Sequence, residues 1–203
     1  MIAIITGDII NSEAHRASQW IPVLKQYFSQ LGDDPKEWEI YRGDEFQLKV
    51  SPKQALISAI QIKAMIKSVK NLDVRLGIGL GDETFSGAGV SESNGTAYQR
   101  SGRVFEGLKE RKLNLAFASG NAAYDNTFNL MLKLALDFMD DWSTVSAEII
   151  TLALQQPKTS QKEMAKQLNI QQSAVSQRQK RARLELVQDL LEFYSHTLNT
   201  LEL

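Results

Sequence analysis

A short stretch, Ile40–Val50, constrains the fold of this chain more than any other. Its sequence, I-Y-R-G-D-E-F-Q-L-K-V, places two apolar segments on either side of a tight Arg42-Gly43 turn. Such a pattern predicts a β-hairpin. Two acids, Asp44 and Glu45, follow the glycine directly. Carboxylates at the tip of a turn suit hard cations such as Mg²⁺ or Mn²⁺, so the hairpin is a candidate metal site.

A second acid-bearing segment, Ile2–Ile10, is a candidate neighbour of this hairpin. It is rich in isoleucine and has no charge before Asp8, which is typical of a strand buried on both faces. If the two segments pair, Asp8 and Asp44 face each other across one small site. The candidate metal ligands are then Asp8, Asp44 and Glu45. In the competing interpretation the aspartates are turn and cap residues, and Glu45 faces solvent.

The hydrophobic periodicity predicts a βαββαβαβα order over residues 1–140. Helical spacing is found at residues 14–31, 52–70, 96–108 and 122–138, with further strands at 72–80 and 113–118. This order predicts an α+β domain with a mostly antiparallel, ferredoxin-like sheet and helices on one face. Glycines in the strand at 72–80 let another backbone or a ligand come close. We interpret Arg75, in the same strand, as a structural or surface charge.

The composition limits the number of domains, the partners and the cell compartment that we expect. The 203 residues suit one or two domains, and the net charge of −1 gives no whole-chain attraction to nucleic acid or membranes. The absence of cysteine excludes disulfides and thiolate chemistry and suits a cytoplasmic protein. We expect no signal peptide, because the N-terminus leads directly into a strand-like run. We also expect no membrane span, because no apolar run approaches about eighteen residues.

After Asp140 every expected element is helical, which predicts a second, all-α domain at residues 141–203. Residues 159–184 have a helix-turn-helix pattern, with the small Ala165 where two helices would cross closely. The charge there is distinctive: between Pro157 and Leu184, seven Lys and Arg residues oppose one acid, so 7 − 1 = +6. A basic patch confined to one segment is typical of nucleic-acid contact.

The second helix of this motif would enter the major groove of DNA. Amide and hydroxyl side chains read base edges, and basic side chains contact phosphates. The candidate base contacts are Gln171, Gln172, Ser173, Ser176 and Gln177, and the candidate phosphate contacts are Arg178, Lys180, Arg181 and Arg183. The alternative is a helical hairpin used for dimerisation, with a solvated basic face.

The recognition helix has no obvious breaker before the chain ends, so we expect it to continue as a long C-terminal helix. Its apolar stripe predicts a dimer contact or docking against the first domain. Symmetric dimers usually read operators, so a homodimer suits both domains.

Most of residues 1–120 resemble class III nucleotidyl cyclases in the order and spacing of their motifs. Gly7–Ser12 resembles the first metal motif, and residues 42–46, R-G-D-E-F, are similar to the G-G-D-E-F hairpin of diguanylate cyclases. Residues 74–89 resemble the strand and glycine loop that follow. Residues 95–103 resemble the helix with the Asn-x-x-x-Arg motif, with Gln99 and Arg103 at those two positions.

The resemblance implies that Asp8 and Asp44 hold Mg²⁺ or Mn²⁺, which binds the triphosphate of a nucleotide. It also implies that, in an active enzyme, Arg103 is the phosphate or transition-state ligand and Gln99 is a hydrogen-bonding partner. In the competing interpretation Arg103 is a surface residue of its helix. The chain departs from the cyclases at Gln99, which is longer than asparagine, and at Ile40, where adenylyl cyclases carry a base-reading lysine. Residues 159–184 resemble sigma-factor region 4, and the whole chain resembles the bacterial SatD family.

The preferred hypothesis is a DNA-binding transcriptional regulator whose cyclase-like domain binds a nucleotide, a divalent metal or both. One alternative is an active Mg²⁺-dependent nucleotidyl cyclase or nucleotidyl transferase with a targeting or dimerisation module. The other is an interaction adaptor without catalysis.

Overall fold

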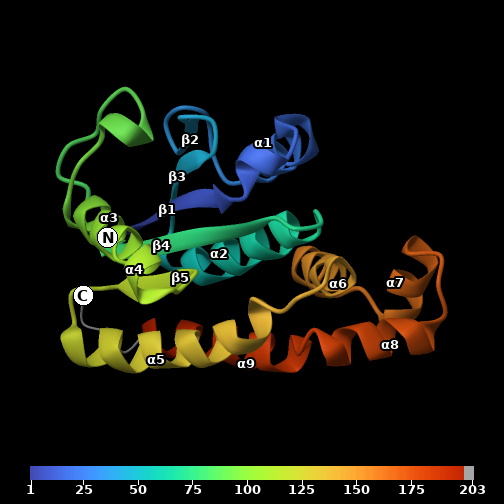
Figure 1. The fold of residues 1–203 in the computed structure, drawn as a ribbon. Helices are drawn as coiled ribbons and strands as arrows, with labels where there is room; N and C mark the ends of the chain where they lie inside the picture. Colours follow the sequence, from blue (N-terminus) through green and yellow to red (C-terminus); the bar gives the residue numbers. More distant parts are fainter. Residues whose placement is uncertain (199–203) are drawn as a thin grey trace.

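The computed structural model describes residues 1–198 and shows an α+β fold around one five-stranded sheet (Figure 1). The strands are β1 (Ile2–Ile10), β2 (Trp38–Tyr41), β3 (Glu45–Val50), β4 (Asp73–Gly81) and β5 (Leu115–Ala118). Their order is β2-β3-β1-β4-β5, and all neighbours are antiparallel except β4 and β5. The α+β class and the mostly antiparallel sheet are therefore confirmed.

The helices alternate with the strands and then continue alone. The first group is α1 (Ile21–Phe28), α2 (Pro52–Lys67), α3 (Thr96–Glu106), α4 (Leu108–Arg111) and α5 (Ala122–Met139). The second is α6 (Thr144–Gln155), α7 (Gln161–Gln167), α8 (Gln172–Arg181) and α9 (Leu184–Leu198). Short 3-10 turns lie at Ser12–Ala14 (η1), Ala17–Gln19 (η2) and Val90–Glu92 (η3). Among the described residues, no helix is both long and apolar enough to cross a membrane.

Helices cover both faces of the sheet, which corrects the expectation of helices on one face. Alternate residues of β4, Gly77, Gly79 and Gly81, lie under α3. A Cβ atom at Gly79 would come within 2.3 Å of the Ala97 carbonyl oxygen and the Ser101 nitrogen. The intervening β4 residues belong to the main apolar core with α2. Three glycines in one row remove the side chains that would hold a helix away, so α3 packs closely.

The main core lies on the α2 face and extends into the C-terminal helices. Tyr194 of α9 is buried, with its ring 5.9 Å from that of Phe117 and 5.3 Å from that of Phe128. Its hydroxyl donates a 2.8 Å hydrogen bond to the Pro52 carbonyl oxygen at the start of α2. The apolar stripe of α9 therefore packs against the sheet domain, one of the two partners expected for it.

α8 and α9 are separate helices, so the expectation of one continuous helix is wrong. Arg183 has a φ of 56°, in the left-handed region, and stands between the end of α8 and the start of α9. A right-handed helix cannot continue through such a residue. Trp142 Nε1 donates a 2.9 Å hydrogen bond to the carbonyl oxygen of Ala182, which fixes the break against the core.

The expected domain boundary at residues 140 and 141 falls between α5 and α6, and the helices beyond it share the core of the sheet domain. Residues 199–203 of the expected second domain lie outside the described residues.

A buried charge cluster lies at the junction between α5 and α6. Lys63 of α2 has no exposed side-chain surface, and its Nζ lies 2.7 Å from Asp73 Oδ1 and 2.6 Å from Asp140 Oδ1.

Candidate functional site

Four polar side chains from four strands form one row across the sheet, which we call the polar row. Asp8 of β1 pairs with Arg75 of β4 on one side and with Glu45 of β3 on the other. Glu45 in turn pairs with Tyr41 of β2. Directly opposed residues of antiparallel strands share a face. The row lies on the α3 face, because Thr6, two residues before Asp8, hydrogen-bonds Ser101 of α3.

Arg75 holds Asp8 in a two-point ion pair. Arg75 Nε donates a 2.8 Å hydrogen bond to Asp8 Oδ1, and Nη2 donates to Oδ2. The two side chains are only 24% and 17% exposed, so solvent screens the pair weakly. The hydrogen bond to Asp8 and the charges of Asp8 and Asp44 raise the pKa of the Arg75 guanidinium above its ordinary value. Arg75 is thus the partner of Asp8, a role that the sequence did not reveal.

Asp44 reaches the same end of the sheet through the hairpin turn. Ile9 N donates a 3.1 Å hydrogen bond to the Asp44 carbonyl oxygen, so the expected pairing of the two segments is confirmed. The Ser12 hydroxyl donates a 2.6 Å hydrogen bond to Asp44 Oδ2. Arg42 and Gly43 both have positive φ, at 51° and 90°, which makes the turn tight.

The polar row does not fit a two-metal centre as it is arranged. Both oxygens of Asp8 accept from Arg75, so a cation would have to displace the guanidinium, while Asp44 accepts from Ser12 through Oδ2 alone. Glu45 is half-buried and lies 4.0 Å from the exposed Arg42. Within residues 1–198 no group of three or more His, Cys, Asp or Glu side chains is placed to hold a metal ion.

Gln99 and Arg103 lie on the exposed side of α3, one turn apart. Ala97 and Ser101 of the same helix face the sheet and are buried. Among the ion pairs of the described residues, none joins Arg103 to an acid of the polar row. The structure therefore pairs Asp8 with Glu45 and places Asp44 at the same end of the sheet, and no hydrogen bond or ion pair of the described residues joins Gln99 or Arg103 to these acids.

A second candidate site is the pair α7 and α8 at the other end of the molecule (Figure 1). Ser160 caps α7, because its hydroxyl accepts from Glu163 N while the Glu163 carboxylate accepts from Ser160 N. The turn between the helices contains Asn169 in the left-handed region, with a φ of 51°. Val175 of α8 is fully buried, and α8 packs on both α6 and α7. One face of α8 is thus fixed and the opposite face is free.

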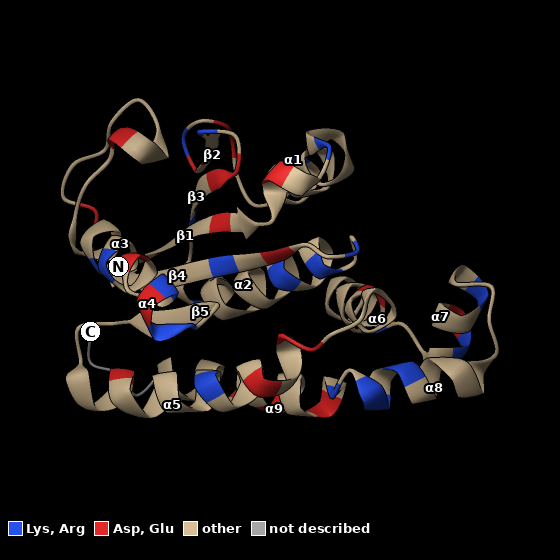
Figure 2. Cartoon of the chain, in the orientation of Figure 1, with Lys and Arg blue, Asp and Glu red and all other residues tan. Residues whose placement is uncertain are grey.

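The free face of α8 carries most of the predicted contact residues. The exposed ones are Gln171, Gln172, Ser173, Ser176, Gln177, Lys180 and Arg181. Figure 2 shows the basic residues gathered along α8, with others on α7. Two predicted contact residues have partners inside the molecule: Arg178 Nη1 donates a 3.2 Å hydrogen bond to Glu148 Oε2 of α6, and Gln172 Nε2 donates to Gln161 Oε1 of α7. Arg178 therefore helps to fix α8 on α6, and Lys180 and Arg181 remain the exposed cations of this helix end.

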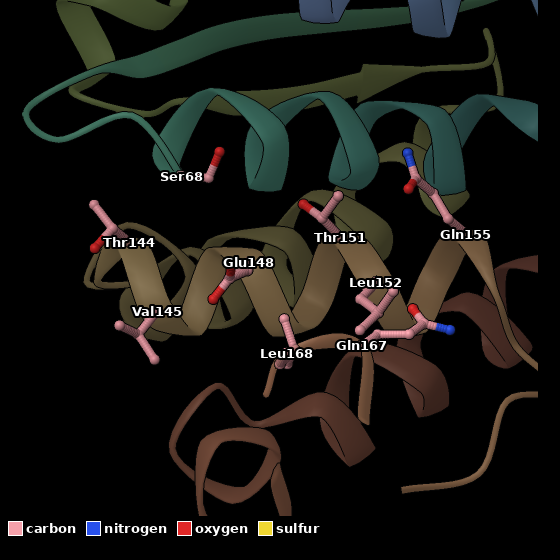
Figure 3. A pocket seen from close by; sticks show the side chains of 9 residues that line it. All are labelled: Ser68, Thr144, Val145, Glu148, Thr151, Leu152, Gln155, Gln167 and Leu168. Atoms are coloured by element: carbon pink, nitrogen blue, oxygen red, sulfur yellow. The ribbon is translucent and has the colours of Figure 1, made fainter. Parts of the chain in front are cut away.

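A cleft of about 550 Å³ lies between α2, α6 and α7 (Figure 3). Figure 3 shows Ser68, which directly follows α2, on one side of α6, with Gln167 at the end of α7 and the next residue, Leu168, on the other side. Glu148, the partner of Arg178, is one of its lining residues. The remaining polar lining consists of hydroxyl and amide groups. No local motif could have revealed this cleft, because three separately packed helices form it.

One comparison with known proteins gives a result. The model of the SatD family matches residues 1–189. The chain belongs to the SatD family. The match covers the sheet, the polar row, α7 and α8, so this SatD-family chain carries both candidate sites within the shared region. No curated protein and no solved structure matches it.

Proposed function

We propose that this SatD-family protein is a DNA-binding transcriptional regulator that inserts α8 into the major groove. The observation that carries the proposal is the division of α8 into two faces. Val175 fixes one face in the core, while Ser173, Ser176 and Gln177 stand exposed on the other. The N-terminal part of a recognition helix needs this division, because one side must pack and the other must reach base edges.

The charge distribution supports the same proposal. The exposed Lys180 and Arg181 follow the amide-bearing turn of α8, and Lys162 and Lys166 lie on α7. Cations beside a base-reading surface provide the salt-dependent part of DNA affinity. A homodimer would present two copies of α8 to a symmetric operator.

We further propose that the sheet domain binds a nucleotide and regulates the DNA contact. The support is topological: β1 lies between β3 and β4 and is antiparallel to both, the arrangement of a split βαββαβ sheet like that of the cyclases. A nucleotide that binds only the folded chain must raise its melting temperature. A panel of nucleotides, each with and without Mg²⁺, tests this point.

An active nucleotidyl cyclase or transferase is the second candidate, favoured by the meeting of Asp8 and Asp44 on paired strands. It requires turnover of ATP or GTP with Mg²⁺ or Mn²⁺ that is lost in Asp44→Ala. The absence of product at high protein concentration would contradict it.

The direct test of base reading is sequence discrimination. Duplexes selected by the protein from a random pool are compared with unselected duplexes. Gln177→Ala should reduce the preference by roughly tenfold, since one good base contact contributes about 1–3 kcal/mol of discrimination. Gln26→Ala, on the exposed side of α1, is the matched control and should leave the preference unchanged. Enrichment of no sequence, or equal preference in both variants, would contradict the proposal.

A further inference from the structure

The Asp8 end of the sheet contains a cation of its own. Arg75 contacts both carboxylate oxygens of Asp8, and the field of Asp44 also reaches the guanidinium. A guanidinium offers a planar fork of donors that matches a carboxylate, and it carries its charge at every physiological pH. The negative charge of Asp8 is therefore already compensated by the Arg75 guanidinium, without a metal ion.

The sheet fixes the backbone of Arg75 directly opposite Asp8. Arg75 stands inside β4, between Val74 and Leu76, which are both fully buried. Its strand is paired on both sides, with β1 and with β5. The register Asp8↔Arg75 thus sets the ion pair through the backbone itself.

We infer that Arg75 takes the place of a divalent cation at the Asp8–Asp44 site and closes this site to metal. The inference does not depend on DNA binding. It also specifies the acids that a metal would find if Arg75 were removed: Asp8 and Asp44, the two carboxylates whose charges act on the guanidinium. Two carboxylates at one end of a sheet, freed of their internal cation, offer oxygen ligands of the kind that Mn²⁺ prefers.

The register supports this assignment over a chance surface pair. Consecutive pairing across four strands joins Tyr41, Glu45, Asp8 and Arg75. Arg75 is the one cation among these four residues. A second nearby cation, Arg42, is 80% exposed, and its Nη1 lies 4.0 Å from Glu45 Oε2, a long distance for an ion pair. It therefore competes weakly for Asp8. Removal of Arg75 leaves the acids without a buried counter-charge.

Mn²⁺ alone is the probe, and the electron paramagnetic resonance signal of free Mn²⁺ is the readout. The proteins are the full wild-type chain, Arg75→Gln, Arg75→Lys and the double variant Arg75→Gln/Asp8→Asn. Wild type and Arg75→Lys should leave millimolar Mn²⁺ free. Arg75→Gln should bind it at least tenfold more tightly than wild type, with a matching rise in melting temperature. The double variant should lose most of that gain.

Two results would overturn the inference. One is Mn²⁺ binding by the wild-type chain that disappears in Asp8→Asn. The other is a folded Arg75→Gln that binds Mn²⁺ no better than wild type. If Arg75→Gln does not fold, Arg75→Met takes its place, because its stem can keep the packing of the arginine side chain. Mn²⁺ binding by the wild-type chain that depends on Asp8 would contradict the inference even if no Arg75 variant folds.

Discussion

At the scale of single residues, buried charge is concentrated where the sheet domain meets the C-terminal helices. Lys63 is fully buried between Asp73 and Asp140, and the neighbouring Lys67 donates both to Asp73 and to the Asp140 carbonyl oxygen. Two lysines of α2 thus join the start of β4 to the end of α5. A buried ion pair need not add net stability, but the loss of Lys63 would leave the Asp140 carboxylate without its cation, while Asp73 would keep Lys67.

Lys63→Met should therefore lower the free energy of unfolding by about 3 kcal/mol, as measured by urea denaturation. The matched control is Lys53→Met on the same helix, where the side chain is exposed. The control should stay within about 0.5 kcal/mol of wild type. Equal effects of the two changes would show that the charge cluster has no structural role.

At the scale of elements, the covering of the second sheet face depends on the glycines of β4. Gly79→Ala places a Cβ atom 2.3 Å from two backbone atoms of α3, so one element must shift. We expect a loss of about 2 kcal/mol in unfolding free energy.

The matched control lies on α3 itself. A Cβ atom at Gly102 would meet nothing within 4 Å, so Gly102→Ala should stabilise the helix by up to about 1 kcal/mol. Thermal unfolding of both variants measures the contrast. If Gly79→Ala were as stable as Gly102→Ala, the close packing of α3 on β4 would be wrong.

Elements were more predictable from the sequence than the contacts between them. Period-two and period-3.6 patterns marked the strands, and the acids at the hairpin and the amides of α8 were visible as local motifs. The ion pair of Arg75 depends on a strand register with a partner 67 residues away, which no local pattern encodes. The break at Arg183 was missed for a similar reason, because neither Gly nor Pro marks it in the sequence. The long-range hydrogen bond from Trp142 to Ala182 lies next to the break.

At the scale of the whole molecule, the two predicted domains share one apolar core. Tyr194 packs on Phe117 and Phe128, and Trp142 donates to Ala182. We expect a single cooperative unfolding transition, with coincident curves from far-ultraviolet and near-ultraviolet circular dichroism. Two separated transitions would show that the helices after residue 141 unfold independently.

This shared core gives a physical route between the two candidate sites. α2 packs on the sheet and also on α6, and α6 holds α8 through Glu148 and Arg178. A ligand that shifts α2 or α6 would therefore change the placement of α8. Such coupling requires a ligand with different affinities for two arrangements of these helices.

The central claim is that α8 contacts DNA, and the salt dependence of binding tests it most directly. Lys180→Ala/Arg181→Ala removes two exposed cations from α8, and Lys109→Ala/Arg111→Ala removes two exposed cations from α4. Binding of each protein to a fluorescent duplex is measured over a range of salt concentrations. The α8 variant should bind more weakly and lose ~2 from the slope of log K against log salt, one for each phosphate contact. The α4 variant should match wild type, and an α8 variant that also matched wild type would contradict the account.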